Sequence, residues 1–419
     1  MLHLAELRRA AALAAASLTI LLSACGGGGG DGTPGPDAAT ASVSSGLFPE
    51  SSSLAGVCTV QGQKQWLRSY MHENYLWSGE MPDADPQAHA AIPSYFDALL
   101  VRTPDATGRA RDRFSTTMSS SAADVMQNVA AAASAAAMAS SANPVPLTSV
   151  VRSTGGRKVG YVLFNEHSRG AQDALITSFR GLRAAAIQDL VLDLRYNSGG
   201  FIYIAQTAAS MVAGPSVDGK LFESVRFNDR RSNESASETF LFSSRVQRGE
   251  SVYGVGDPLP QLSLPRLYVL TSQLTCSASE SIVNSLRGIG VQVILVGDRT
   301  CGKPYGFYRK DNCGQAYFPI EFQVYNAAGF GDYQDGFPVQ CRVAENPRSA
   351  LGSTAEPLLA AALNHIDSGS CSTATATATQ YAASVLRQSD GASMLDRPEA
   401  PPADSPMYQP GWDGRRLQP

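Results

Sequence analysis

The chain has 419 residues and a mass of 44.2 kDa, with 43% hydrophobic and 17% charged residues. This length is enough for one large domain or two ordinary ones with a sizeable core. The 33 basic and 37 acidic side chains give a net charge of −4, and no block of basic residues occurs. The charge therefore gives no reason to expect binding of nucleic acid through electrostatic attraction. The 5 histidines lack ligand-like spacing, so we expect neither a metal site nor a metal cofactor.

Residues 1–24 have the features of an export signal. Arg8 and Arg9 precede an apolar run over residues 10–22, which is shorter than the roughly 20 apolar residues of a membrane-spanning helix. The run ends in Leu-Ser-Ala-Cys, which resembles a bacterial lipobox in which Cys25 is lipidated and becomes the new amino terminus. The alternative is a plain signal peptide with an incidental cysteine.

The residue after the cysteine favours one location. Gly26 stands where an Asp would retain a lipoprotein at the inner membrane. We therefore expect a lipid-anchored protein of the outer membrane of a Gram-negative cell, facing the periplasm, with the membrane contacted through the lipid alone.

Composition divides the rest of the chain. Residues 25–53 are rich in Gly, Pro, Ala and Ser and predict a flexible tether. Residues 54–118 contain apolar side chains at helical spacing and predict a small helical domain. Residues 119–146 are mostly Ala and Ser and predict a weak helix or a linker. Residues 147–371 then form the main domain, and residues 372–419 predict a disordered tail.

Strands and helices alternate in the main domain. Strands are predicted at 159–165, 190–194, 267–271 and 291–296, and helices at 171–186 and 277–287. This alternation predicts an α/β fold.

Six cysteines remain once the lipidated one is set aside, and an even number in an oxidising compartment predicts disulfides. Six cysteines allow about 15 pairings. Our hypothesis pairs Cys301 with Cys313 across one loop and Cys341 with Cys371 at the end of the domain. For Cys276, a disulfide or a buried thiol is favoured over a second nucleophile.

Three short motifs each follow a predicted strand, where open α/β sheets place their ligand sites. They are Asp-Leu-Arg-Tyr-Asn-Ser-Gly-Gly at 193–200, Thr-Cys-Ser-Ala-Ser-Glu at 275–280 and Gly-Asp-Arg-Thr-Cys-Gly-Lys at 297–303. A serine hydroxyl becomes a good nucleophile when a neighbouring base takes its proton, and a lysine with a lowered pKa can be that base. The physical interpretation is a nucleophile at Ser277 and a base at Lys303.

Backbone donors complete this interpretation. At a helix start, the Ala278 N–H is free to stabilise an oxyanion, and the N–H of Gly199 or Gly200 can approach the same point. The structural alternative is that Ser277 only caps the helix, with Glu280 in its first turn.

Together the three motifs resemble the carboxy-terminal processing (tail-specific) protease family, over about residues 150–371. The resemblance implies a crotonase/ClpP-like mixed sheet with helices, preceded by the small helical unit. It also implies a serine endopeptidase without a cofactor that acts on protein or peptide substrates, here exported proteins. In this family Ser277 corresponds to the nucleophile, Lys303 to the base, and Ala278 with Gly199 or Gly200 to the oxyanion hole.

Two departures from the family pattern leave an alternative open. Family members commonly carry a Gln four positions after the lysine, where this chain has Phe307, so Glu280 or a backbone carbonyl is expected to orient the lysine. The stretch between Phe114 and Val150 is also shorter than the roughly 50 residues of a small domain, so a PDZ module is not expected. The alternative is a catalytically silent, peptide-binding outer-membrane lipoprotein on the same fold.

Other polar residues have structural interpretations. Asp193 and Arg195 are expected to form ion pairs at a strand end, and His167 is expected on the surface. Asp332 and Asp335 lack the spacing of a calcium loop.

Overall fold

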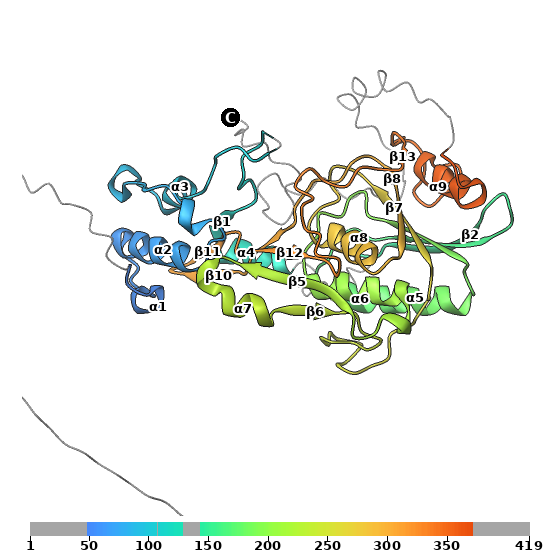
Figure 1. The fold of residues 1–419 in the computed structure, drawn as a ribbon, viewed down its shortest axis with the longest axis horizontal. Coiled ribbons are helices and arrows are strands. Elements are labelled where there is room, and N and C mark those ends of the chain that lie inside the picture. The colour runs from blue at the N-terminus through green and yellow to red at the C-terminus, as the bar shows by residue number, and fades with distance from the viewer. Residues whose placement is uncertain (1–47, 107, 129–142, 372–419) are drawn as a thin grey trace, which may run out of the picture. The chain divides into compact units, whose positions relative to one another are not determined.

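The structure, a computed structural model, describes residues 48–128 and 143–371 except residue 107 (Figure 1). The predicted signal, Cys25, nearly all of the tether and the predicted tail lie outside the described residues. Within the described ranges, no helix combines the length and hydropathy required to cross a membrane.

Helices and strands alternate through most of the described chain. The α-helices are α1 (Ser51–Leu54), α2 (Val60–Asn74), α3 (Ile92–Ala98), α4 (Ser120–Asn128), α5 (Ala171–Ala184), α6 (Ile202–Ala213), α7 (Ser232–Ser237), α8 (Ala278–Gly288) and α9 (Pro357–Ser368). Short 3₁₀ helices are η1 (Ser78–Glu80), η2 (Pro86–Ala88), η3 (Pro215–Val217) and η4 (Asp229–Arg231). The strands are β1 (Thr116–Ser119), β2 (Leu147–Arg152), β3 (Lys158–Leu163), β4 (Asp189–Asp193), β5 (Leu221–Phe227), β6 (Thr239–Leu241), β7 (Arg266–Thr271), β8 (Gln292–Gly297), β9 (Tyr305–Gly306), β10 (Lys310–Asn312), β11 (Gln315–Phe318), β12 (Phe322–Tyr325) and β13 (Cys341–Arg342).

The largest sheet has the strand order β13-β8-β7-β4-β3-β2. Neighbours from β13 to β3 are parallel, and β2 adds an antiparallel edge. The parallel strands are almost wholly buried because helices cover both faces of the sheet. The predicted α/β fold with a mixed sheet is confirmed.

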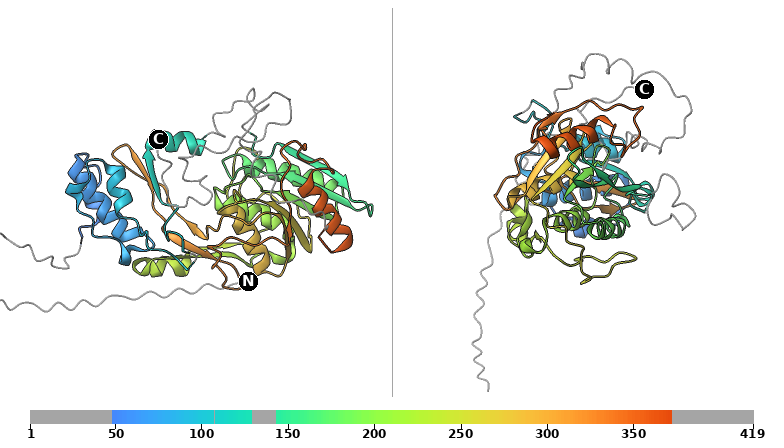
Figure 2. Two further views of the ribbon diagram at one scale, coloured as in Figure 1. Left: turned by 90° about the horizontal axis from the view of Figure 1, so that it is seen from above. Right: turned by 90° about the vertical axis from the view of Figure 1, so that its right-hand side faces the viewer.

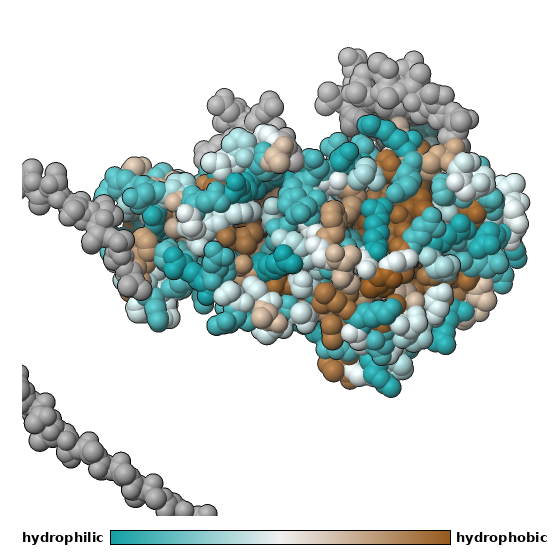
Figure 3. All heavy atoms as spheres, viewed as in Figure 1, coloured by the Kyte–Doolittle hydropathy of each residue, from teal (hydrophilic) through white to brown (hydrophobic). Residues whose placement is uncertain are grey.

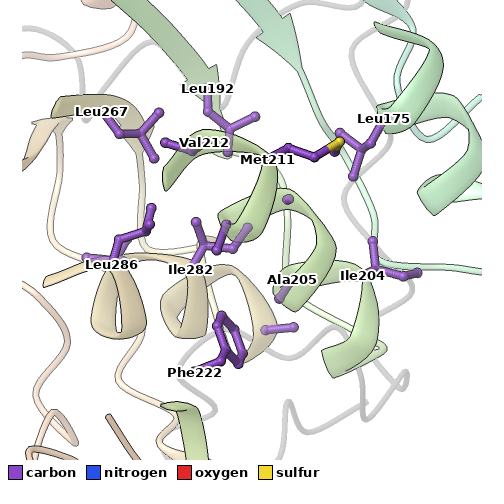
Figure 4. Close-up of a cluster of buried hydrophobic side chains, with 14 of the residues drawn as sticks. Leu175, Leu192, Ile204, Ala205, Met211, Val212, Phe222, Leu267, Ile282 and Leu286 are labelled. Atoms are coloured by element: carbon purple, nitrogen blue, oxygen red, sulfur yellow. The ribbon is translucent and has the colours of Figure 1, made fainter. Parts of the chain in front are cut away.

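Alternate residues of each strand face opposite sides of this sheet. Leu190 and Leu192 of β4 belong to a core that α5, α6 and α8 complete, part of which is drawn in Figure 4. Val191 belongs to the smaller core that α9 completes. Figure 2 shows α9 on one side of the strands and α5 and α6 on the other.

The predicted helical unit is confirmed, and it shares a core with the chain's later strands. Trp66 of α2 and Phe96 of α3 contact Tyr317 of β11, with ring centroids 5.1 and 6.0 Å apart. Two smaller sheets, β1-β11-β10 and β6-β5-β12-β9, continue the structure beyond the large sheet. Because β1 pairs with β11, the helical unit and the α/β core are one packed body.

The stretch at 119–146, predicted as a weak helix or a linker, begins with a helix. Residues 120–128 form α4, and its Ala123 is fully buried against Phe318. A helix of 9 residues is too short to be stable from propensity alone, and packing against β11 supplies stability.

The disulfides are Cys58–Cys313, Cys276–Cys301 and Cys341–Cys371. The predicted Cys341–Cys371 pair is confirmed, whereas the predicted Cys301–Cys313 pair is wrong. Cys313 lies at the β10–β11 turn, which meets the segment between α1 and α2. Cys301 lies in the loop after β8, where it meets Cys276 just before the start of α8.

Hydrophilic and hydrophobic residues are interspersed over the face seen in Figure 3. Among the described residues, exposed large apolar side chains occur on different elements, including Val150 on β2 and Leu241 on β6. Single exposed apolar residues of this kind are ordinary on protein surfaces.

A buried ion pair joins the end of β4 to α9. The Arg195 guanidinium donates to both Glu356 carboxylate oxygens at 2.8 and 2.9 Å, and to Asp193 Oδ1 at 2.9 Å. All three side chains are buried, and Glu356 Oε2 also accepts the Leu359 N–H at the start of α9. The predicted structural role of Asp193 and Arg195 is confirmed.

Replacing Glu356 should therefore destabilise the fold. We expect Glu356→Ala to lower the free energy of unfolding by about 3 to 5 kcal/mol, because a buried guanidinium loses its bidentate partner. Urea denaturation measures this. The control is Asp83→Ala, which removes an exposed partner of Arg68 and should cost less than about 1 kcal/mol. Equal effects of the two substitutions would contradict the assignment.

Candidate active site

Ser277 lies at the sharp turn between β7 and α8. It occupies the N-cap position of α8 with φ 54° and ψ −118°, a conformation that residues other than glycine rarely adopt. Backbone strain of this kind persists only where the surroundings hold it, and it is frequent at functional sites. The side chain is half-buried, and the next N–H along the chain, that of Ala278, has no acceptor among the hydrogen bonds of the described residues.

Lys303 follows β8 and is only 5% exposed. Its Nζ lies 4.4 Å from the ring centroid of Phe307 and 5.3 Å from that of Phe114. Burial lowers the pKa of Lys303 to about 8, although the carboxylates of Asp112 and Glu280 oppose this shift. A large fraction of this amine is therefore neutral at mildly alkaline pH. Phe307 contributes an apolar wall to the same pocket.

Glu280 connects the turn that carries Ser277 with the loop after β8 that carries Lys303. Its buried carboxylate accepts the Ser277 N–H at 3.1 Å and the Thr300 hydroxyl at 2.6 Å. It also accepts the N–H of Gly302 at 2.9 Å and that of Lys303 at 2.8 Å. Burial raises the pKa of Glu280, and the four hydrogen bonds act against that shift. Glu280 thus holds the backbone of the segment that carries Lys303. That Glu280 or a backbone carbonyl orients the lysine side chain stays a prediction.

The turn at Gly199 and Gly200, which ends the motif at 193–200, lies directly against the start of α8. A Cβ added to Gly199 would be 2.8 Å from the Ser277 Cβ and 2.9 Å from the Ala278 nitrogen. The Gly199 N–H already donates to Asn197 Oδ1 at 3.0 Å. Gly200 forms a parallel bridge with His167 in which the bonds come from the residues on either side of Gly200.

The bridge between His167 and Gly200 determines the direction of the Gly200 N–H. In a parallel ladder, the residue between the two bonded groups directs its own N–H to the opposite side. The Gly200 N–H therefore points away from His167. Among the hydrogen bonds of the described residues, neither it nor the Ala278 N–H has an acceptor.

Asn197 and His167 were not predicted to be part of this site. The Asn197 carbonyl accepts the Cys276 N–H at 3.1 Å and the Ser279 hydroxyl at 2.9 Å. Its side chain bonds Gly199 N–H and lies 2.9 Å from His167 Nδ1. The expected surface position of His167 is wrong, since the residue is fully buried. Burial lowers the pKa of His167 to about 3, so its imidazole is neutral.

The helical unit also reaches the site, which no local pattern indicated. Arg113 is buried and donates to the Gly302 carbonyl at 3.2 Å and to the Gln334 carbonyl at 2.8 Å. Phe114, the next residue, is one of the rings beside Lys303. The two Arg113 contacts join positions 189 and 221 residues apart, so only the folded chain reveals them.

Some polar clusters have other roles. Asp335 forms an ion pair with Arg109 at 3.2 Å. Two described clusters have the proximity of metal ligands, Cys276 with Glu280 and Cys301, and Cys341 with His365 and Cys371. All four cysteines are in disulfides, and a disulfide sulfur is not the thiolate that binds metal.

Known proteins resemble both parts of this chain. Residues 158–307 match the sequence profile of peptidase family S41, and residues 62–116 match that of the peptidase S41 N-terminal domain. A carboxyl-terminal-processing protease from Picosynechococcus sp. is 31% identical over 159 residues, which cover 38% of this chain and 32% of that protein. The chain thus spans about a third of the length of this curated relative.

A solved structure has the same fold. The crystal structure assigned to the S41 proteases from Bacteroides fragilis superimposes with a TM-score of 0.55 and 21% identity. The match covers 73% of this chain and 97% of that one. At this identity the likeness concerns the fold.

The contact between the glycine turn and the start of α8 can be tested by stability. We expect Gly199→Ala to lower the free energy of unfolding by about 3 kcal/mol or more, because φ is +102° and the new methyl group would overlap backbone atoms. Gly156→Ala is the matched control, since φ there is +84° with no atom within 4 Å of the added Cβ, and should cost only about 1 to 2 kcal/mol. Chemical denaturation of both variants gives the comparison, and similar costs would refute the close approach.

Proposed function

We propose that this chain, which matches the sequence profiles of peptidase family S41 and of its N-terminal domain, is a serine endopeptidase that uses a Ser277–Lys303 dyad. The observation that carries the proposal is the pairing of a half-exposed serine at a strained helix start with a buried, largely desolvated lysine amine. Glu280 and a disulfide tie together the two backbone segments that bear them. A neutral amine in such a pocket is a base suited to activating a hydroxyl.

The chemistry follows from these roles. Ser277 Oγ attacks the peptide carbonyl while Lys303 Nζ accepts its proton. The N–H groups of Ala278 and Gly200 bind the oxyanion, since Gly199 already donates to Asn197. Lys303 then returns the proton to the leaving amine, the acyl-enzyme forms, and water releases it by the same steps in reverse.

We also propose that the substrates are exported proteins and that the enzyme is a lipoprotein anchored through Cys25 at the periplasmic face of the outer membrane. The anchor rests on the sequence of residues 1–26. Three disulfides among the six cysteines of the described chain support an oxidising compartment.

Substitution of the two proposed dyad residues tests the activity. We expect the full chain to cleave an unfolded model protein such as casein, and Ser277→Ala and Lys303→Met each to lose at least about a thousandfold in kcat while keeping the far-UV circular dichroism of the unmodified chain. Met fills the space of the lysine stem without an amine. If the unmodified chain binds peptides but cuts none, the silent peptide-binding lipoprotein becomes the better description.

The pH dependence is a separate expectation. Because Lys303 acts in its neutral form and its pKa is lowered to about 8, kcat/KM should fall about tenfold per pH unit below about 8 and level off above it. The steady-state rate between pH 6 and 10 gives the profile. A rate that is flat between pH 6 and 8 would show that another group is the base.

A further inference from the structure

The Cys276–Cys301 disulfide lies between the two proposed dyad residues. Cys276 immediately precedes Ser277, and Cys301 stands two positions before Lys303. The two Cα atoms are 5.2 Å apart, and the residues are 2% and 4% exposed. The cross-link is therefore an interior connection between the serine turn and the lysine segment.

The position of this cross-link matters because the sheet has ended there. The pairing of β7 with β8 ends at Thr271 and Gly297. After these residues, the two segments leave the sheet as loops. Beyond that point the loops are joined by the Cys301 N–H donating to the Thr275 carbonyl at 3.0 Å and by the Glu280 carboxylate. The disulfide is the covalent member of this set, and Cys301 Sγ lies 3.4 Å from Glu280 Oε2.

The serine conformation needs such a restraint. A φ of 54° is unfavourable for serine, so Ser277 keeps it only while its neighbours are held on both sides. On the preceding side, Glu280 accepts the Ser277 N–H and the Asn197 carbonyl accepts the Cys276 N–H; on the following side, the Ser277 carbonyl accepts the N–H groups of Glu280 and Ser281. The sulfur of Cys276 then fixes the distance from this turn to the segment that carries Lys303.

We propose that the Cys276–Cys301 disulfide is the positioning element of the dyad: it holds Ser277 in its strained turn at a fixed distance from Lys303, and turnover depends on it. This inference rests on the proposed function. Both cysteines act through Ser277 and Lys303, and neither contacts the reacting atoms.

A second disulfide of the same chain is a matched control. Cys341–Cys371 closes a loop with a sequence separation of 30, against 25 for Cys276–Cys301. Loop-closure entropy depends on the logarithm of loop length, so both disulfides should contribute nearly the same stability. Cys341–Cys371 joins β13 to the end of α9, away from the serine turn. A difference in turnover between the two variants, each lacking one disulfide, therefore reflects where the disulfide lies and not how much stability it contributes.

The test compares Cys276→Ala/Cys301→Ser with Cys341→Ala/Cys371→Ser in the full chain. Serine keeps a polar group of similar size beside Glu280 in place of the Cys301 sulfur. We expect the first variant to lose at least about a hundredfold in kcat with KM changed less than threefold, and the second to stay within threefold of the unmodified chain. Equal kcat in the two variants would overturn the proposal.

A measurement that needs no turnover keeps the two proposals apart. The chain has only five lysines, so selective labelling gives a sparse side-chain NMR spectrum in which Lys303→Met assigns the Lys303 signal. We expect its pKa to move from about 8 toward the ordinary value for lysine when the disulfide is removed, because water reaches the loosened segment. An unchanged pKa overturns the positioning role. A shifted pKa in a chain that cuts no substrate upholds it and rejects the peptidase.

Reduction covers the case in which the double variant fails to fold. Dithiothreitol passes two electrons and two protons to the cystine and becomes a cyclic disulfide, leaving two cysteine thiols. Trapping with iodoacetamide and mass mapping then orders the loss of each disulfide in the unmodified chain against the loss of turnover. The loss of turnover should coincide with the reduction of the Cys276–Cys301 disulfide. A loss that follows either of the other two disulfides would count against the proposal.

Discussion

The site depends on one buried carboxylate. Glu280 accepts hydrogen bonds from the serine turn and from the lysine segment at once, and no other hydrogen-bonding side chain among the described residues serves both. A carboxylate in an interior costs free energy unless donors surround it, and four donors meet that requirement only when both segments are in place. The requirement to satisfy Glu280 therefore ties the backbone at Ser277 to that at Lys303, beside the covalent link of the Cys276–Cys301 disulfide.

The loop that carries Lys303 is held from three directions, and this explains why the pKa of Lys303 is lowered. Glu280 contacts it from α8, Arg113 contacts it from the helical unit, and the Cys276–Cys301 disulfide closes the remaining side. The rings of Phe114 and Phe307 then exclude water from the amine. Because desolvation is the main reason for the lowered pKa of Lys303, the N-terminal helical unit contributes directly to the protonation state of the site.

The glycine turn is placed by polar contacts with the interior. Asn197 bonds the serine turn through its carbonyl and the glycine turn through its side chain, and the neutral imidazole of His167 lies against the same amide. Two residues earlier, Arg195 anchors the end of β4 to α9. The first motif is thus mainly a support, which leaves Gly200 and Ala278 as the backbone donors with no acceptor among the described contacts.

The sequence by itself determined the alternation of strands and helices and the three motifs at strand ends, because periodicity, helix starts and glycine turns are properties of neighbouring residues. It predicted the Cys341–Cys371 pair and the ion pairs of Arg195 correctly. It missed the burial of His167, the partner of Cys301 and the role of Glu280 toward the lysine backbone. The contacts of Arg113 and Phe114 with the lysine segment were also missed. Each of these depends on which distant segments pack together, and only tertiary packing decides which polar groups lose water and therefore which partners they must find.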